Sequence, residues 1–321
     1  MSRGSVSQSR RKFLRDVTFG ASAFWASACL TSKLSAQEIN DADAMRASGA
    51  SAKISVETLR RRISVLLGSG GNIAVLAGQD GKILIDSGFA TSKPQISEAV
   101  NHLSNDPIRH LINTHWHFDH TDGNQWVHEA GATIIGHENT RNRLSARQEI
   151  PEFHGIFPPS PAGARPAIVF SGEKTLQLNG EELRLQYYGA AHTDSDISVR
   201  FVRANVLHTG DTWFNGTYPF IDYHNGGSLD GMIAASGQNL RLADNQTIIV
   251  PGHGPIGGKA ELAEYDAMLH VVRERVSALK KQGRSAQETI AAGPSSSFDA
   301  KWGNGLVPPK AFVEVIYNGI K

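Results

Sequence analysis

Four side chains that can bind a metal ion lie within six consecutive residues. They are His115, His117, Asp119 and His120, and they follow the largely apolar run 108–112. Such a run is typical of a buried strand, so the four residues are expected on a loop at a strand end. Imidazole and carboxylate together suit Zn²⁺ or a similar first-row ion. One ion would leave ligands unused, whereas two adjacent ions would use all four.

Three further residues of the same kinds each follow another strand-like run. His192 follows 183–188, Asp211 comes after 206–208, and His253 comes after 248–250. Taken singly, these are weak signals. The intervals are 72 residues from His120 to His192, 19 to Asp211 and 42 to His253. Spacings this long exclude a local metal-binding loop, so only a folded domain can assemble the site.

As a set, these residues resemble the metallo-β-lactamase superfamily, whose mark is an HxHxDH motif followed by a distant His, a distant Asp and a final His. The resemblance covers about residues 53–258. It implies two groups of ligands, one for each ion: His115, His117 and His192 for the first, and Asp119, His120 and His253 for the second, with Asp211 bridging them.

The chemistry expected of this site is metal-dependent hydrolysis of a small molecule. Two adjacent Zn²⁺ ions, or Mn²⁺ or Fe²⁺ in their place, would acidify a bridging water so that hydroxide forms near neutral pH. That hydroxide would attack the carbonyl of an ester, lactone, thioester or lactam. Asp119 is the candidate catalytic residue, because its carboxylate could orient the nucleophile or pass on its proton.

The residue expected to bridge the ions narrows the class of substrate. In the lactam-cleaving branches of the superfamily, the bridging position resembles a Cys or Ser. The carboxylate of Asp211 is instead similar to the residue at this position in the hydroxyacylglutathione hydrolase, lactonase and sulfatase branches. Phe214 stands where N-acyl-homoserine lactonases typically carry a Tyr. Two alternatives stay open, a β-lactamase-type amide hydrolase and a non-hydrolytic di-iron redox or metal-binding protein. The second usually needs a flavin domain, and the sequence contains no flavodoxin-like segment.

Other residues are expected to support the site. Asp86 ends an early apolar run and resembles an acidic motif of the superfamily; its carboxylate would accept a proton from a ligating imidazole or serve a turn. Trp116, Trp213 and Phe214 lie beside expected ligands and are candidates to line the substrate pocket.

The elements that must position these residues are a mixture of strands and helices. Strands are predicted at 63–67, 72–77, 82–86, 108–112 and 132–135, with four or five more over 167–207 and one ending at 250. Helices are predicted at 92–104, 123–129, 138–148, 229–240, 261–281, 285–292 and 309–320, and 148–165 has no periodicity. The resemblance implies that these elements form a four-layered αββα sandwich. Residues 259–321 are expected to form a helical segment packed on it, with dimerisation as the alternative role.

The first 36 residues have the layout of an export signal. Arg10 and Arg11 form a twin-arginine pattern, the apolar stretch 17–30 is too short for a permanent membrane span, and Ala36 offers a cleavage site. This pattern resembles signals of bacterial proteins exported already folded. It predicts a periplasmic or secreted enzyme exported by the twin-arginine machinery. Residues 37–52 are small and polar and are expected to form a linker between the signal and the catalytic domain.

Cleavage after Ala36 would remove the single cysteine, Cys29. The mature chain would then have no thiol, disulfide or cysteine metal ligand. Lipid anchoring through Cys29 is disfavoured, because Ala26 stands where a larger aliphatic residue is usual. The signal carries a net charge of +5, so the whole-chain charge of +1 becomes about −4. An acidic protein of this kind lacks the basic footprint of a nucleic-acid enzyme.

Overall fold

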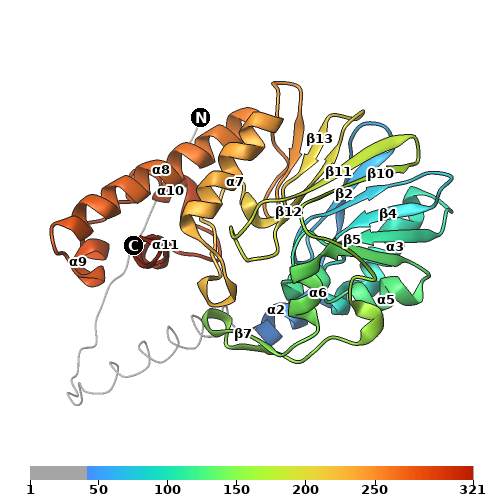
Figure 1. Ribbon diagram of the computed structural model, residues 1–321, viewed down its shortest axis with the longest axis horizontal. Helices are drawn as coiled ribbons and strands as arrows, with labels where there is room; N and C mark the ends of the chain where they lie inside the picture. The colour runs from blue at the N-terminus through green and yellow to red at the C-terminus, as the bar shows by residue number, and fades with distance from the viewer. Residues whose placement is uncertain (1–41, 321) are drawn as a thin grey trace, which may run out of the picture. The chain divides into compact units, whose positions relative to one another are not determined.

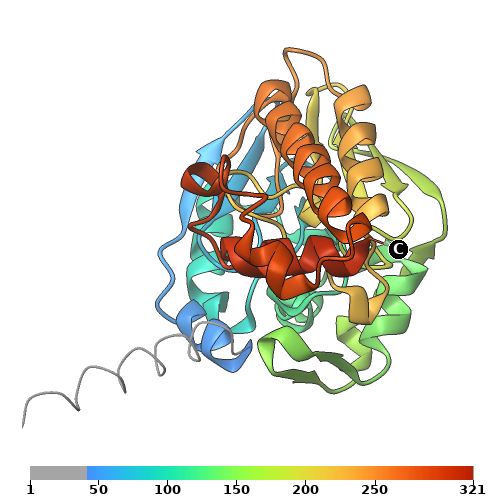
Figure 2. The ribbon, with the colours of Figure 1, turned by 90° about the vertical axis from the view of Figure 1, so that its left-hand side faces the viewer.

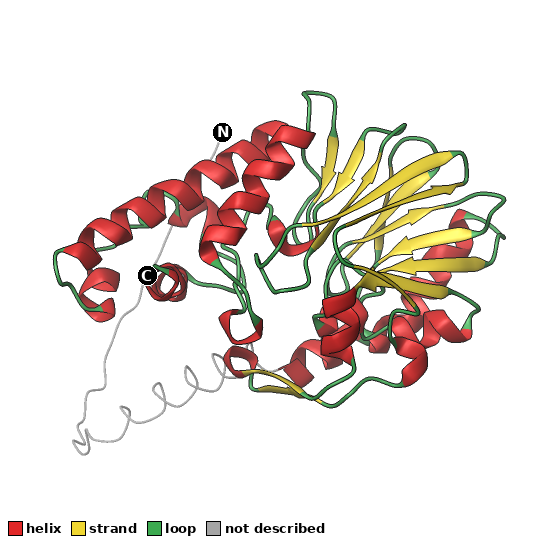
Figure 3. Cartoon of the chain, viewed as in Figure 1, coloured by secondary structure: helices red, strands yellow, loops and turns green. Residues whose placement is uncertain are grey.

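The computed structural model describes residues 42–320, which form two facing sheets with helices on both outer sides (Figure 1). The layers are most easily followed in Figure 3, where the strands lie between two groups of helices. This arrangement is the expected αββα sandwich with helices at the C-terminal end. The predicted export signal lies outside the described residues.

The first sheet has seven strands in the order β1-β2-β3-β4-β5-β6-β9. Its first four strands pair antiparallel, whereas β4, β5, β6 and β9 pair parallel. The strands are β1 (Ser55–Thr58), β2 (Ile63–Leu67), β3 (Ile73–Leu76), β4 (Lys82–Ile85), β5 (Ile108–Ile112), β6 (Thr133–His137) and β9 (Ile168–Phe170).

The second sheet has five strands in chain order. Its pairs are antiparallel except for β13 and β14, which run parallel. The strands are β10 (Glu173–Leu178), β11 (Glu181–Tyr187), β12 (Ile197–Phe201), β13 (Val206–His208) and β14 (Ile248–Val250). The sequence predicted four or five strands over 167–207, and the structure has five there, β9 to β13.

The central strands of the first sheet are apolar on both faces because both faces are covered. Ile83 and Ile85 of β4 pack into the core between the sheets, together with Leu185 and Val199 of the second sheet. Leu84, between them in sequence, packs into a separate core under the helices of the first sheet. Alternate residues of a strand point to opposite faces, so a near-continuous apolar run is what such a buried strand requires.

Helices cover the outer face of each sheet. The first sheet is covered by α3 (Lys93–Leu103) and α5 (Asn124–Glu129), and α6 (Glu138–Leu144) lies against β6 and β9. The second sheet is covered by α7 (Leu229–Leu242) and α8 (Lys259–Lys281), which are visible in Figure 2. The remaining helices pack on these two: α9 (Ala286–Ala291), α10 (Asp299–Trp302) and α11 (Pro309–Gly319). None of the described helices combines the length and apolar composition needed to cross a bilayer.

The C-terminal helices pack on the second sheet through a continuous apolar core. The positions of α8 that recur at three- and four-residue steps are the ones that are buried, among them Leu262, Leu269 and Val276. They share a core with Phe312 of α11 and with Leu207 and Ile249 of the sheet.

Two segments differ from the sequence-based expectation. The segment 37–52, expected to be a linker, contains helix α2 (Ala42–Gly49). Its alanines favour helix, and Arg46 ties it to Asp122 through contacts of 2.6 and 3.0 Å. The aperiodic segment 148–165 contains a small hairpin of β7 (Gln148–Ile150) and β8 (Gly155–Phe157).

Short helices connect many of these elements. The α-helical turn α4 (Phe118–Thr121) follows β5, and five 3₁₀ turns complete the list: η1 (Ala90–Ser92), η2 (Pro151–Phe153), η3 (Ala162–Ala164), η4 (Gly210–Thr212) and η5 (Tyr223–Asn225). The parallel strands β4 and β5 end at the same edge of the first sheet, and β13 and β14 end together in the second. The loops that leave these ends carry the candidate ligands.

Candidate metal centre

The loop and helical turn after β5 bring four candidate ligands together. The rings of His115 and His120 have centroids 4.3 Å apart, and those of His115 and His117 are 4.9 Å apart. His117 is the residue before α4, so this turn places Asp119 and His120 on the same side as the two preceding imidazoles. The three histidines are almost fully buried.

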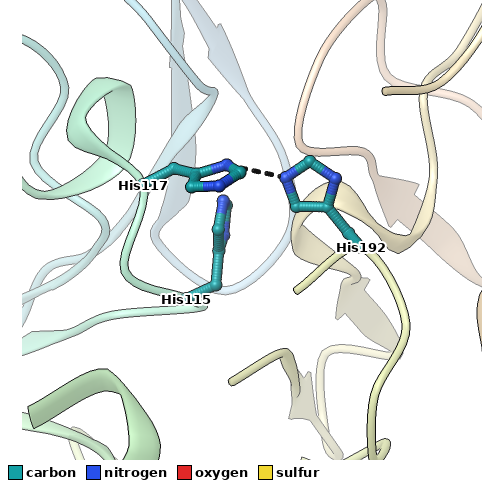
Figure 4. A group of neighbouring side chains, drawn as sticks. All are labelled: His115, His117 and His192. Carbon is teal, nitrogen blue, oxygen red and sulfur yellow. Dashed lines mark hydrogen bonds between the residues drawn. The ribbon is translucent and has the colours of Figure 1, made fainter. Parts of the chain in front are cut away.

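The three distant residues join this group from the second sheet. Nε2 of His192, on the loop after β11, lies 2.8 Å from Nδ1 of His117 (Figure 4). Nε2 of His253, beyond β14, lies 3.1 Å from Oδ2 of Asp119. Asp211 lies in η4, between the others. The structure thus brings all seven predicted ligands into one cluster.

Asp211 contacts members of both expected ligand groups. Its Oδ1 lies 3.1 Å from Nε2 of His120, and its Oδ2 lies 3.4 Å from Nε2 of His192 and 3.3 Å from Nε2 of His253. Gly252 leaves space for this carboxylate, because a Cβ atom there would lie 1.9 Å from Oδ1 of Asp211. The carboxylate therefore stands where a ligand shared by two ions would stand.

Hydrogen bonds outside the cluster fix which ring nitrogen of each histidine faces it. Asp86 Oδ2 accepts from Nδ1 of His120 at 2.8 Å and also accepts from Thr114 Oγ1 at 2.7 Å. Because the Thr114 hydroxyl donates to Asp86, its oxygen accepts from Nδ1 of His115 at 3.0 Å. The structure thus places Asp86 as an acceptor behind the ligands, and its left-handed φ of 65° belongs to this turn.

Asp222 is a supporting residue that the sequence reasoning missed. Its Oδ2 accepts from Nε2 of His117 at 2.9 Å, and the backbone oxygen of Phe220 accepts from Nδ1 of His192 at 2.8 Å. Asn225 donates to Asp222 through its backbone and its side chain. No periodic pattern or motif marks the segment 212–225. The only available signal was an acidic residue in an irregular segment.

These bonds leave lone pairs directed at one another, which is the arrangement that a cation resolves. With Nε2 of His117 and Nδ1 of His192 both donating outward, the two nitrogens that lie 2.8 Å apart each present a lone pair. Nε2 of His115 is buried without a hydrogen-bond partner. The ligand atoms of each group lie within 4.8 Å of one another, and tetrahedral Zn²⁺ would separate its nitrogens by about 3.3 Å. The residues therefore fit metal ions.

In the absence of metal, some candidate ligands are neutral and others are charged. Burial lowers the pKa of His192 to about 4 and holds that of His115 well below its usual range, so both imidazoles are neutral. Burial opposes protonation of His253 as well, but the carboxylates of Asp211 and Asp119 outweigh it and raise the pKa of His253 to about 9. Burial would raise the pKa of Asp119, but the charges of His120 and His253 lower it to about 2.

A cavity of about 330 Å³ opens beside the cluster. Phe214 lines it, as predicted, and its ring stacks on that of His253 at a centroid distance of 5.3 Å. Trp116 and Trp213 do not line it, so this part of the prediction was wrong. Both indoles are buried in the apolar core instead, and residues adjacent in sequence to a ligand need not face the same cavity as that ligand.

The comparisons with known proteins agree with this geometry. Residues 66–253 match the family model of the metallo-beta-lactamase superfamily. A hydroxyacylglutathione hydrolase of Polaromonas sp. (strain JS666) is 28% identical over 148 residues, 46% of this chain and 48% of the relative. A beta-lactamase-like protein 2 homolog of Caenorhabditis elegans is 26% identical over 235 residues, 70% of this chain and 67% of the relative. The chain thus spans about half the length of the first of these relatives.

Solved structures show the same fold. A metallo-beta-lactamase from Pontibacter korlensis superposes with a TM-score of 0.55 at 17% identity, covering 68% of this chain and 99% of that one. A variant of the sec-alkyl sulfatase PisA1 gives a TM-score of 0.61 at 16% identity, covering 87% of this chain and 53% of that one. At these identities the likeness concerns the fold.

Proposed function

The chain belongs to the metallo-β-lactamase superfamily, and on that premise we propose that it is a hydrolase with two metal ions, normally zinc, that cleaves a small thioester, ester or lactone. The observation that carries this proposal is the position of Asp211. Its two oxygens lie within 3.4 Å of imidazole nitrogens from both ligand groups. Two observations favour ester, lactone and thioester substrates over lactams. They are the carboxylate at this position and the relatives named as hydroxyacylglutathione hydrolases.

The protein's own residues would hold the ions. His115, His117 and His192 offer neutral nitrogens to one ion, and Asp119, His120 and His253 offer a mixed set to the other. Two bound ions would supply an acidified water and polarise the carbonyl. Asp119 stays ionised, as its pKa of about 2 indicates, and its carboxylate would orient the attacking group.

The test is a panel of chromogenic substrates offered to the purified zinc-loaded protein. The panel holds a thioester, an aryl ester, a lactone, a lactam, a phosphodiester and a sulfate ester. We expect carbonyl esters and thioesters to be cleaved faster than the lactam, and we expect a chelator to abolish turnover until zinc is restored. Absence of turnover on every carbonyl substrate would contradict the proposal. An iron-loaded protein with redox activity would favour the di-iron alternative.

We also propose that the protein leaves the cytoplasm folded through the twin-arginine pathway. The support is Arg10 and Arg11 ahead of the apolar stretch 17–30. Cell fractionation of the full chain should place the processed protein outside the cytoplasm. The paired change Arg10→Lys and Arg11→Lys should leave it inside and unprocessed. Export of the double variant at the wild-type rate would refute this pathway.

A further inference from the structure

The cavity beside the metal ligands is lined by two chemically different sets of side chains. One set is polar and includes His117, Asp119 and Asp211. The other set, here called the apolar side, comes from five separate parts of the chain, among them Met45, Phe89, Phe153, Phe220, Leu306 and Val307. A bound molecule would therefore have its reacting group at the ligands and the rest of its atoms against hydrocarbon.

No lysine or arginine among residues 42–320 lines this cavity. Arg46 lies nearby, but its guanidinium binds Asp122 and lies over the rings of Phe118 and Phe157, each at 5.0 Å. The hydroxyl of Tyr218 is also engaged, because it donates to Asp299 at 2.7 Å. A remote carboxylate of a substrate would find no cation here, and burying an unpaired charge is strongly unfavourable.

Part of the apolar side comes from outside the segment that matches the family. Met45 belongs to α2, and Leu306 and Val307 belong to the loop between α10 and α11, whereas the match spans 66–253. Leu306 is 40% exposed, so its side chain contributes little to the core. Its side chain lines the cavity and is therefore accessible to a bound molecule.

We propose that this pocket selects substrates whose non-reacting part is uncharged and apolar, and that Met45 and Leu306 set this preference. The inference rests on the proposed hydrolase function and narrows its substrate class. It disfavours glutathione-like substrates, which carry carboxylates remote from the reacting carbonyl. The selected class is alkyl or aryl esters and thioesters.

The first test compares chain length and charge on the zinc-loaded full-length protein. The substrates are 4-nitrophenyl acetate, butyrate, hexanoate and octanoate, together with the half ester of suberic acid, which matches octanoate in length and ends in a carboxylate. We expect kcat/KM to rise about three- to fourfold per buried methylene until the pocket is full. The suberate half ester should react at least tenfold more slowly than octanoate. Equal or faster turnover of the charged ester would overturn the proposal.

The second test introduces a cation into the apolar side. Leu306→Lys should raise kcat/KM for the suberate half ester relative to octanoate at least tenfold. Val56→Lys is the matched control, because Val56 is 41% exposed on β1 and does not line the cavity. The control should leave the ratio unchanged. An unchanged ratio in Leu306→Lys, or the same change in both variants, would overturn the role of Leu306.

A binding measurement separates this inference from the hydrolase function. The neutral dye N-phenyl-1-naphthylamine should bind the metal-free protein with enhanced fluorescence, and Leu306→Lys or Met45→Asp should weaken that binding at least fivefold. If no ester is cleaved yet the dye result holds, the proposed function fails and the apolar preference stands. If esters are cleaved without preference and the dye binds both variants equally, the preference fails alone.

Discussion

Four of the five imidazoles in the cluster donate their outer N–H group to a protein oxygen. The acceptors are the hydroxyl of Thr114, the carboxylates of Asp86 and Asp222, and the backbone oxygen of Phe220. Each bond fixes a tautomer and leaves the other nitrogen free to bind a metal ion. At the scale of residues, then, affinity for metal depends on groups that never contact the ion.

The role of Asp222 can be measured through the first ligand group. Asp222→Asn should lower zinc affinity at that group about ten- to a hundredfold, because the amide holds His117 less firmly than the carboxylate does. Competition with a chromophoric chelator measures this change. Asp230→Asn, which alters an exposed partner of Arg273, should leave the affinity unaltered. Unaltered affinity in Asp222→Asn would show that Asp222 only shapes its loop.

The stability of the metal-free protein should fall at high pH. Folding raises the pKa of His253 from its ordinary value of about 6.5 to about 9, mainly through Asp211 and Asp119 against the effect of burial. The corresponding stabilisation is fully present below about pH 6.5 and is lost as the pH rises through about 9. We expect a lower Tm at pH 9.5 than at pH 6.5 in chelator-treated protein. His253→Gln should flatten this dependence, and an equally steep profile in that variant would contradict the assignment.

At the scale of elements, the site depends on loops that approach one another without side chains between them. A Cβ atom at Gly71 would lie 2.0 Å from Cε1 of His120, and one at Gly252 would lie 1.9 Å from Oδ1 of Asp211. Both glycines lie on loops that leave or enter strands at the ligand edge of the sheets. The backbone at these positions forms the floor of the site.

Gly252→Ala should therefore displace the shared carboxylate. We expect the variant to bind fewer than two zinc ions per chain and to lose more than a hundredfold in kcat/KM on its best substrate. Gly237→Ala is the matched control, because the added methyl would meet only Nη1 of Arg241, at 3.5 Å, on the helix α7. That control should keep both ions and gain about 0.5–1 kcal/mol in stability. Full metal content in Gly252→Ala would show that the loop can shift to accommodate the added methyl group.

Elements marked by an apolar run or by a clear helical period were the ones that the sequence predicted well. The strands at 63–67 and 108–112 have the predicted bounds, and the helix predicted at 261–281 begins only two residues earlier. Helix α2 was missed because its eight residues are mostly small and carry no apolar stripe. Helix α2 is held on the domain by tertiary contacts, such as the ion pair of Arg46 with Asp122, which local sequence patterns do not reveal.

At the scale of the whole molecule, the cavity draws on both ends of the described chain as well as on the family-matched segment. Local patterns marked the HxHxDH segment and the residues at strand ends, and the resemblance to the superfamily joined them into one ligand set. The sequence could not predict which residues line the cavity, because no local pattern relates Met45 to Leu306. For the same reason Trp116 and Trp213 were assigned to the pocket by their proximity to ligands, although their rings point into the core.

The C-terminal helices should stabilise the whole domain. Phe312 of α11 is fully buried and stacks on Tyr218, which lines the cavity, at a centroid distance of 4.0 Å. Phe312→Ala should lower the free energy of unfolding by about 3–5 kcal/mol, as measured by chemical denaturation. Leu306→Ala, at an exposed position near the same cavity, should change it by less than about 0.5 kcal/mol. A small effect of Phe312→Ala would mean that α11 is not part of the cooperative unit.

The central claim is that seven side chains from two sheets hold two ions with Asp211 between them. The most direct measurement is the metal content per chain of the zinc-loaded protein, determined by mass spectrometry of the metal alongside amino-acid analysis. We expect two zinc ions per chain in the wild type and fewer in Asp211→Ala. A wild-type preparation that holds less than one ion per chain and still hydrolyses its best substrate at full rate would contradict this claim.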